Sequence, residues 1–285
     1  MSGKRVMTIQ KIELKIGLGS PIRILQVSDA HLSGCCEEDS EKSKAKSRKK
    51  TAAFLEESGG VPQEQRLKEA LELAEDCDAL VFTGDIADSP SRANLELLES
   101  MLEGRKYLYT FGNHDYYSYD SDSGCAEDRE RYLDDFLRFL PCDPTMDAMQ
   151  IGGVNLVTLD DSLAQFSWLQ LGFLKAEIEK GLPILLFLHL PIYSPTFVPK
   201  AYEWWDSSMC VGTPADVLAA HGETDPKMPA DEATQAMLEL IRTEPLIKAI
   251  FASHLHFTDE AEVLGKPQFV NEPCYLGSVR EIVLR

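Results

Sequence analysis

Short apolar runs alternate along this chain with segments in which apolar residues recur at helical spacing. The short runs are typical of buried strands. They lie at 22–27, 79–83, 107–111, 154–159, 184–188 and 247–252. The helical spacing predicts helices with one apolar face. These lie at 63–75, 91–103, 128–140, 167–180 and 231–242. Strands that alternate with helices predict an α/β architecture, in which helices cover the sheets.

The two ends of the chain depart from this alternation. Residues 7–16 alternate polar and apolar positions, and the turn residues at 17–21 follow them, which predicts an opening hairpin with strand 22–27. The tail contains further short β-type runs at 261–263, 268–270 and 279–284. We therefore expect antiparallel additions to the sheets at both ends.

Two polar or irregular segments interrupt the pattern without dividing it. Residues 33–60 are rich in Lys, Ser and Glu and predict a polar insertion loop, and residues 191–230 are rich in Pro and aromatics and predict a cap-like loop segment. We see no linker and no internal repeat, so residues 1–285 are expected to form a single domain. Tyr202, Trp204 and Trp205 in the cap either stack on a flat ligand group or pack the loop, and His221 is expected on the surface.

Charge limits the partners of this chain. Lys and Arg number 28 and Asp and Glu 47, a formal net charge of −19, which disfavours extended nucleic-acid binding and anionic membranes. The run at 41–50 carries six basic residues and one acid, a local +5. It is either a phosphate- or partner-binding patch or a mobile solvated loop, and the second interpretation is favoured.

Cysteine usage and apolar runs bear on the compartment. The seven cysteines are odd in number and lack CxxC spacing, which favours reduced thiols. The N-terminal residues lack the apolar core of a signal peptide, and the longest apolar run, at 182–190, is too short to cross a bilayer. We expect a cytoplasmic protein with no membrane association; its oligomeric state stays open.

Five of the six histidines follow predicted strands directly or within a few residues. In open α/β sheets, ligands collect at the carboxyl ends of the strands, so these side chains are expected to form one site. Asp, His and Asn without thiolate suit Mn, Fe or Zn. An i, i+2 spacing on extended backbone would point paired ligands to the same side. The seven candidates exceed the needs of one tetrahedral ion and suit two divalent ions that share a carboxylate. They are Asp29, His31, Asp85, Asn113, His189, His254 and His256.

In this order, the motifs resemble those of the calcineurin-like metallophosphoesterases. They are Asp29-x-His31, Gly84-Asp85-x-x-Asp88, Gly112-Asn113-His114-Asp115, His189 and His254-x-His256. The resemblance covers nearly the whole chain. It implies a four-layer α/β/β/α sandwich of two mixed sheets flanked by helices, with a dinuclear metal site at the strand ends.

The resemblance also implies a role for each matched residue. Asp29, His31 and His256 match ligands of the first metal, Asp85 the bridging carboxylate, and Asn113, His189 and His254 ligands of the second metal. His114 matches the histidine that contacts the scissile phosphate and assists the leaving group. Asp115 is expected to orient His114. Asp88 is expected to contact the metal ligands without binding the metals itself. Ser253 stands where the family usually has Gly.

The residues around the second and third motifs favour one branch of the family. The family's Ser/Thr protein phosphatases carry an Arg shortly after the second Asp of the second motif and a Glu after the Asn-His pair. Here Ser89 and Pro90 follow Asp88, and Asp115 stands in place of that Glu. The chain is therefore more similar to the phosphodiesterase-like branch. We expect hydrolysis of a small or medium phosphate ester, a diester above all, by attack of a metal-bridging hydroxide. The alternatives are a phosphomonoesterase or nucleotide pyrophosphohydrolase at the same site and, less favoured, a scaffold without catalysis.

Overall fold

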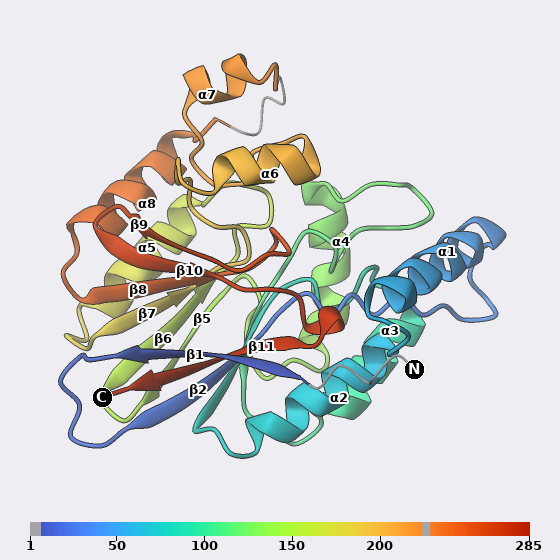
Figure 1. Cartoon of the computed structure of the whole chain (residues 1–285), viewed down its shortest axis with the longest axis horizontal. Helices are drawn as coiled ribbons and strands as arrows, with labels where there is room; N and C mark the ends of the chain where they lie inside the picture. The colour runs from blue at the N-terminus through green and yellow to red at the C-terminus, as the bar shows by residue number, and fades with distance from the viewer. Residues whose placement is uncertain (1–6, 224–228) are drawn as a thin grey trace.

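Two β-sheets lie face to face, and helices cover their outer faces (Figure 1). This computed structural model describes residues 7–223 and 229–285. One sheet has five strands in the order β1-β11-β2-β3-β4, and the other has six in the order β5-β6-β7-β8-β10-β9. Each sheet mixes parallel and antiparallel neighbours. The expected four-layer α/β/β/α sandwich is therefore confirmed.

The strands of the first sheet are β1 (Thr8–Leu14), β2 (Ile22–Val27), β3 (Ala79–Thr83), β4 (Leu108–Thr110) and β11 (Ser278–Leu284). Those of the second sheet are β5 (Met146–Ile151), β6 (Val154–Leu159), β7 (Ile184–Phe187), β8 (Ile247–Ala252), β9 (Asp259–Val263) and β10 (Lys266–Val270). The α-helices are α1 (Glu41–Glu57), α2 (Gln63–Ala74), α3 (Arg92–Leu102), α4 (Ala126–Leu137), α5 (Trp168–Ile178), α6 (Val198–Trp205), α7 (Ala215–Ala220) and α8 (Glu232–Thr243), and a 3-10 turn, η1, spans Cys274–Leu276.

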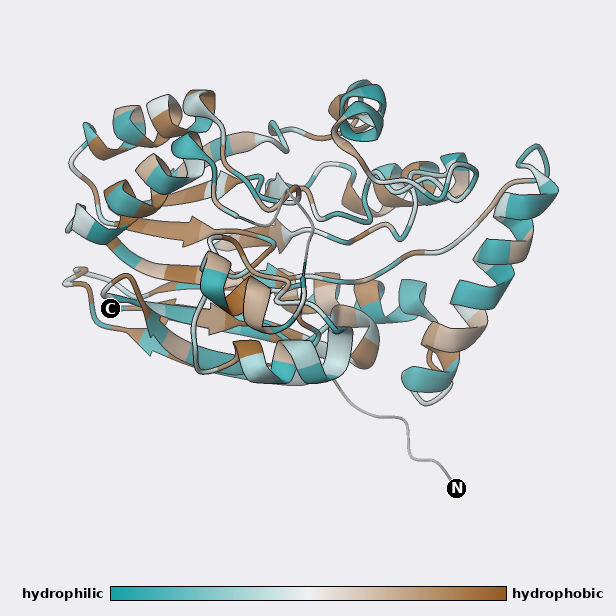
Figure 2. Cartoon of the chain, turned by 90° about the horizontal axis from the view of Figure 1, so that it is seen from above, coloured by the Kyte–Doolittle hydropathy of each residue, from teal (hydrophilic) through white to brown (hydrophobic). Residues whose placement is uncertain are grey.

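Both faces of the second sheet are buried, which explains its continuous apolar runs. Successive side chains of a strand point to opposite faces. In β7, Leu185 and Phe187 pack into the core between the two sheets. Ile184 and Leu186 pack into a second core, beneath α5 and α8. Figure 2 shows the same layering, with largely hydrophobic strands between helices whose outer faces are mostly hydrophilic.

The predicted opening hairpin is wrong, because β11 lies between β1 and β2. β11 pairs in parallel with β1, where Thr8 faces Ser278, and antiparallel with β2, where Ile24 faces Ile282. Its insertion gives the buried C-terminal strand two hydrogen-bonded neighbours. The connection at 17–21 spans two strand spacings, roughly 10 Å, which five residues readily cover.

Strand β5 was not predicted, although its turn carries a readable signal. β5 and β6 form an antiparallel hairpin in which Ile151 faces Val154 across Gly152 and Gly153. Both glycines have positive φ, 54° and 88°, as a two-residue hairpin turn with a matching twist requires.

The polar insertion at 33–60 is not a loop, because most of it forms helix α1. Ser40 caps the helix by accepting a hydrogen bond from the backbone N–H of Ser43. The buried face of α1 is narrow and partly made of Ser43, Ser47 and Phe54, so it lacks the apolar stripe that would have predicted a helix. The basic run thus lies on a helix rather than in a loop, contrary to the favoured interpretation.

The basic run and an acidic loop neutralise each other. Lys42 and Lys46 both form ion pairs with Asp122, and the Ser40 hydroxyl donates to Asp120. These contacts join α1 to the segment that follows the Gly112–Asp115 motif.

The cap expected at 191–230 contains two helices, α6 and α7, and its residues 224–228 lie outside the described part of the chain. All seven cysteines are free. Among residues 7–223 and 229–285, no helix combines the length and apolarity needed to cross a membrane.

Candidate metal centre

The loops after β2, β3, β4, β7 and β8 meet at one edge of the sandwich, as their sequence positions predict. The backbone itself joins them. The N–H groups of Asp29 and His31 donate to the carbonyls of Gly84 and Asp85, and the N–H of Ser253 donates to the carbonyl of His189, each at 3.0 Å. The N–H of His114 in the β4 loop donates to Oδ1 of Asp85, and the hydroxyl of Ser253 in the β8 loop donates to the carbonyl of Thr83, so the five loops, with all seven predicted metal ligands, lie together.

Five of the seven predicted ligands lie on backbone in the left-handed region. Their φ values are 50° for Asp29 and His31, 54° for Asp85, 70° for His254 and 59° for His256. This conformation is uncommon for residues other than glycine and gathers at functional sites. The expectation that i, i+2 pairs converge through extended backbone is therefore wrong. Tight left-handed turns aim these side chains instead.

The first cluster contains Asp29, His31 and His256. The Nε2 atoms of His31 and His256 lie 3.2 Å apart, and Nε2 of His256 lies 3.5 Å from Oδ1 of Asp29. Nε2 of His31 lies 3.9 Å from Oδ2 of Asp85.

The second cluster contains Asp85, His189 and His254, with Asn113 beside them. Nε2 of His189 is its centre. That atom lies 3.2 Å from Oδ2 of Asp85, 3.0 Å from Nδ1 of His254 and 3.2 Å from Oδ1 of Asn113. The same oxygen, Asp85 Oδ2, faces both clusters, so one carboxylate stands between two sets of ligand atoms.

The distances between these atoms, and the lack of hydrogen-bond partners at one buried carboxylate, fit divalent metals. Ligands held about 2.1 Å from one ion lie roughly 3.0–3.4 Å from each other, close to most of the distances above. Both carboxylate oxygens of Asp29 are buried and lack a hydrogen-bond partner among the described residues. Burying a carboxylate without partners is costly, and a bound cation would remove that cost. The donor set thus fits two divalent ions.

A hydrogen bond on the far side of the His189 ring determines which of its two nitrogens faces the cluster. Nδ1 of His189 donates to the carbonyl of Thr83 at 2.8 Å, which leaves Nε2 with a lone pair. Ser253, in the place of the family's usual Gly, donates its hydroxyl to the same carbonyl at 2.8 Å. The site therefore accommodates this departure from the family pattern.

Asp88 is a buried carboxylate that organises one side of the site. Its Oδ1 lies 2.8 Å from Nδ1 of His31 and 3.0 Å from Nδ1 of His114, and its Oδ2 accepts from the hydroxyl of Tyr119. Burial alone would raise the pKa of Asp88, but His114 and His31 outweigh it and hold the pKa far below its usual range. Asp88 thus stays ionised, hydrogen-bonds Nδ1 of His31 and lies within ion-pair distance of Nδ1 of His114.

The structure assigns the orientation of His114 to Asp88, and the expectation that Asp115 orients it is wrong. Asp115 is buried and points away into the backbone. It accepts from the N–H groups of Asp85, Ala87 and Gly112 at 2.8–2.9 Å, and from the hydroxyl of Tyr109. It therefore braces the turns after β3 and β4. Adjacency in sequence misled, because the side chains of successive residues point in different directions.

If the chain has the activity that the motif resemblance implies, replacing Asp88 by Asn should lower the rate of phosphoester hydrolysis by about ten- to a hundredfold, the usual effect of removing a carboxylate that supports a metal-bound histidine. Asn keeps the volume but loses the charge that holds the rings of His31 and His114. Steady-state kinetics would show the change mainly in kcat. A variant with unchanged kcat would contradict this role; Asp134→Asn on the exposed face of α4 serves as the control.

Asp161 is a supporting residue that sequence reasoning missed. It follows β6, and its Oδ1 accepts from the backbone N–H groups of His189 and Leu190 at 3.0 and 3.1 Å. Burial raises its pKa to about 7. Its position just after a predicted strand, like that of the ligands, was an available signal.

The cap aromatics divide between the two expected roles. Tyr202 stacks on the exposed ring of His221, and Trp204 contacts Phe257, so both pack the loop. Trp205 differs, because its ring makes a nearly perpendicular contact with the ring of His256, with centroids 5.2 Å apart. Its indole N–H donates to the carbonyl of Leu255 at 3.1 Å. Trp205 alone of the three borders the candidate centre.

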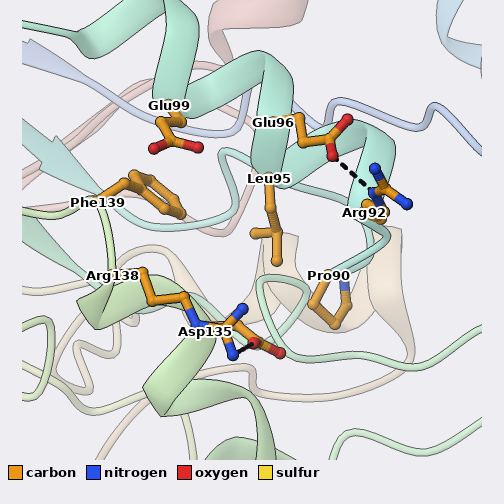
Figure 3. A pocket seen from close by; sticks show the side chains of 8 residues that line it. All are labelled: Pro90, Arg92, Leu95, Glu96, Glu99, Asp135, Arg138 and Phe139. Carbon is orange, nitrogen blue, oxygen red and sulfur yellow. Dashed lines mark hydrogen bonds and ion pairs between the residues drawn. The ribbon is translucent and has the colours of Figure 1, made fainter.

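A separate hollow of about 390 Å³ lies between α3 and α4 (Figure 3). Its two arginines are already paired within their own helical segments, Arg92 with Glu96 and Arg138 with Asp135. It shares no residue with the candidate metal centre, and both of its arginines are neutralised by these ion pairs. We therefore place the chemistry at the strand ends.

The calcineurin-like phosphoesterase family model matches residues 22–257, so the chain belongs to that family. This match confirms the class that the motifs predict, the metallophosphoesterases. The chain is 28% identical over 236 residues to a cAMP/cGMP dual specificity phosphodiesterase of Mycobacterium tuberculosis. The aligned region covers 76% of this chain and 62% of that relative, so the chain spans less than two thirds of the relative's length.

The fold is also found in a dimetal phosphatase from Danio rerio. The two structures superpose with a TM-score of 0.50 at 13% sequence identity, over 90% of this chain and 89% of the other. At this identity the similarity concerns the fold.

Proposed function

We propose that this protein is a two-metal phosphodiesterase that hydrolyses a small or medium phosphate ester. The observation that carries the proposal is the position of Asp85 Oδ2 between two ligand sets. The relative named a cAMP/cGMP phosphodiesterase supports a diester. The proposed ligands are Asp29, His31 and His256 for one ion, Asn113, His189 and His254 for the other, and Asp85 for both. Mn, Fe or Zn suits this donor set.

Two divalent ions, when bound, would supply the bridging hydroxide expected from the sequence and positive charge for the phosphoryl oxygens. Hydrolysis forms one bond from phosphorus to the oxygen of water and breaks the bond to the leaving oxygen. A proton released from the water balances the charge of the leaving group.

His114 is the proposed contact to the reacting phosphate. Its side chain is 26% exposed, whereas Asp29, Asp85 and His189 are fully buried. Its backbone N–H donates to Oδ1 of Asp85 at 2.7 Å, and Asp88 holds Nδ1, so Nε2 is left for a ligand. Burial lowers the pKa of His114, but Asp85 and Asp88 outweigh it and raise the pKa above its ordinary value. A histidine so placed can donate a hydrogen bond to a phosphoryl or leaving oxygen.

A parallel assay of a bis-aryl phosphate and a mono-aryl phosphate with added manganese tests the proposal. We expect the diester to be hydrolysed, with activity lost on chelation and restored by metal. Hydrolysis of the monoester alone would instead support the phosphomonoesterase alternative. Inactivity on both esters, with two metals bound per chain, would favour a scaffold without catalysis.

A further inference from the structure

One face of helix α1 lines the approach to the candidate metal centre. Lys46, Lys50 and Phe54 recur every four residues and so lie on the same side of the helix. Lys46 lies over the rings of Tyr117 and Tyr119, and the ring of Phe54 stacks on that of His31, with centroids 5.0 Å apart and planes at 22°. Arg48 and Lys49 point to solvent. The basic run thus presents selected cations to the site.

Lys50 is the cation of this face that lies nearest to the catalytic side chains, and its ion pair with Asp88 is a long one. Its Nζ lies 5.5 Å from the centre of the Phe54 ring and 3.7 Å from Oδ2 of Asp88. That separation exceeds a hydrogen bond, so the ammonium retains donors for a ligand. Its side chain is 35% exposed. Lys46, by contrast, is committed to Asp122 and to the hydroxyl of Tyr117.

A continuous row of rings places Lys50 and Trp205 at opposite ends of the site. Phe54 contacts His31, the ring of His31 meets that of His256 at 5.1 Å, and His256 meets Trp205. Lys50 lies beyond Phe54, at the end where Asp88 also holds His114. The candidate centre therefore lies between the aromatic Trp205 on α6 and the cationic Lys50 on α1.

We propose that Lys50 is a substrate-binding residue that selects phosphate esters and phosphoanhydrides whose leaving group carries an anionic charge of its own. This inference rests on the proposed function. Asp88 links Lys50 to His114, the residue on the leaving-group side, through its two oxygens. An anionic leaving group there would otherwise face the buried charge of Asp88 within a protein of net charge −19. The Lys50 ammonium supplies the opposite charge at that place.

The experiment compares two substrates in the wild type and three variants. Bis(4-nitrophenyl) phosphate releases a leaving group without a second charged centre, and diadenosine pyrophosphate releases an adenosine monophosphate that carries one. The variants are Lys50→Met, Lys50→Arg and the exposed neighbour Lys49→Met. Because each variant is compared with the wild type on the same substrate, the different reactivities of the two substrates cancel.

Lys50→Met should lower kcat/KM for diadenosine pyrophosphate by about ten- to a hundredfold, mainly through KM, since it removes a charge-assisted contact. The bis-aryl ester should change by less than about threefold. Lys50→Arg should recover most of the loss, and Lys49→Met should match the wild type. An equal fall on both substrates would show that Lys50 only supports Asp88 and would overturn the inference.

Two further outcomes count against the inference in different ways. Wild-type activity on the bis-aryl ester without activity on the pyrophosphate would refute the selection while leaving the proposed phosphodiesterase intact. Inactivity of the metal-loaded wild type on both substrates would refute the proposed function, and the role of Lys50 would fall with it.

Discussion

Replacing Asp85 by Asn should abolish phosphoester hydrolysis and leave at most one metal ion per chain. Oδ2 of Asp85 faces His31 of one ligand set and His189 of the other, and Oδ1 accepts the backbone N–H of His114. Asn preserves the shape but removes the negative charge that two cations would share. We expect kcat to fall by at least about a thousandfold, because stabilisation of the negative charge that develops on the reacting phosphate is usually the largest contribution to catalysis.

Elemental analysis and an ester assay on the same preparation check this result. Asp134→Asn, on the exposed face of α4, should keep two metals and full turnover. Two metals per chain with undiminished turnover in Asp85→Asn would show that the bridge lies elsewhere.

The second large effect is expected at a glycine that carries no functional group. A Cβ on Gly112 would lie 2.2 Å from Oδ1 and 2.4 Å from the backbone nitrogen of Asp85, far inside van der Waals contact. Gly112→Ala should therefore displace Asp85, weaken metal binding and reduce activity by at least about a hundredfold, as misplacement of catalytic groups does.

Gly172→Ala is the matched control, because it lies within α5 and a Cβ there would meet nothing within 4 Å. Alanine in a helix should raise the free energy of unfolding by about 0.5–1 kcal/mol and leave turnover unchanged. Metal titration and thermal unfolding of both variants measure the contrast. Normal metal affinity in Gly112→Ala would mean that the two turns can separate without loss of the site.

The site residues could be predicted from sequence because apolar strands and polar strand ends are both local signals. A run such as 184–188 is followed at once by His189, and the sheet topology then gathers such residues at one edge. The position of β11 between β1 and β2 could not be predicted in this way, since it depends on pairing between residues more than 250 positions apart, such as Leu25 with Glu281.

Helix α1 and the role of Asp88 show the other limits. α1 buries Ser43 and Ser47 on its contact face, so its sequence reads as a solvated run. The Nδ1 contacts of Asp88 to His31 and His114 join residues from three separate loops, and only the fold reveals them. The left-handed backbone of Asp29 and His31 was also not predicted, because Asp and His adopt positive φ more often than most residues but still in only a small share of cases.

The central claim is that the strand-end residues hold two metals on either side of Asp85. The most direct test is anomalous diffraction from crystals of the wild-type protein grown with manganese. We predict two peaks about 3.5–4 Å apart, one among Asp29, His31 and His256 and the other among Asn113, His189 and His254, with Asp85 Oδ2 between them. A single peak, or a peak held by Asp88 and the Nδ1 atoms of His31 and His114, would contradict the account.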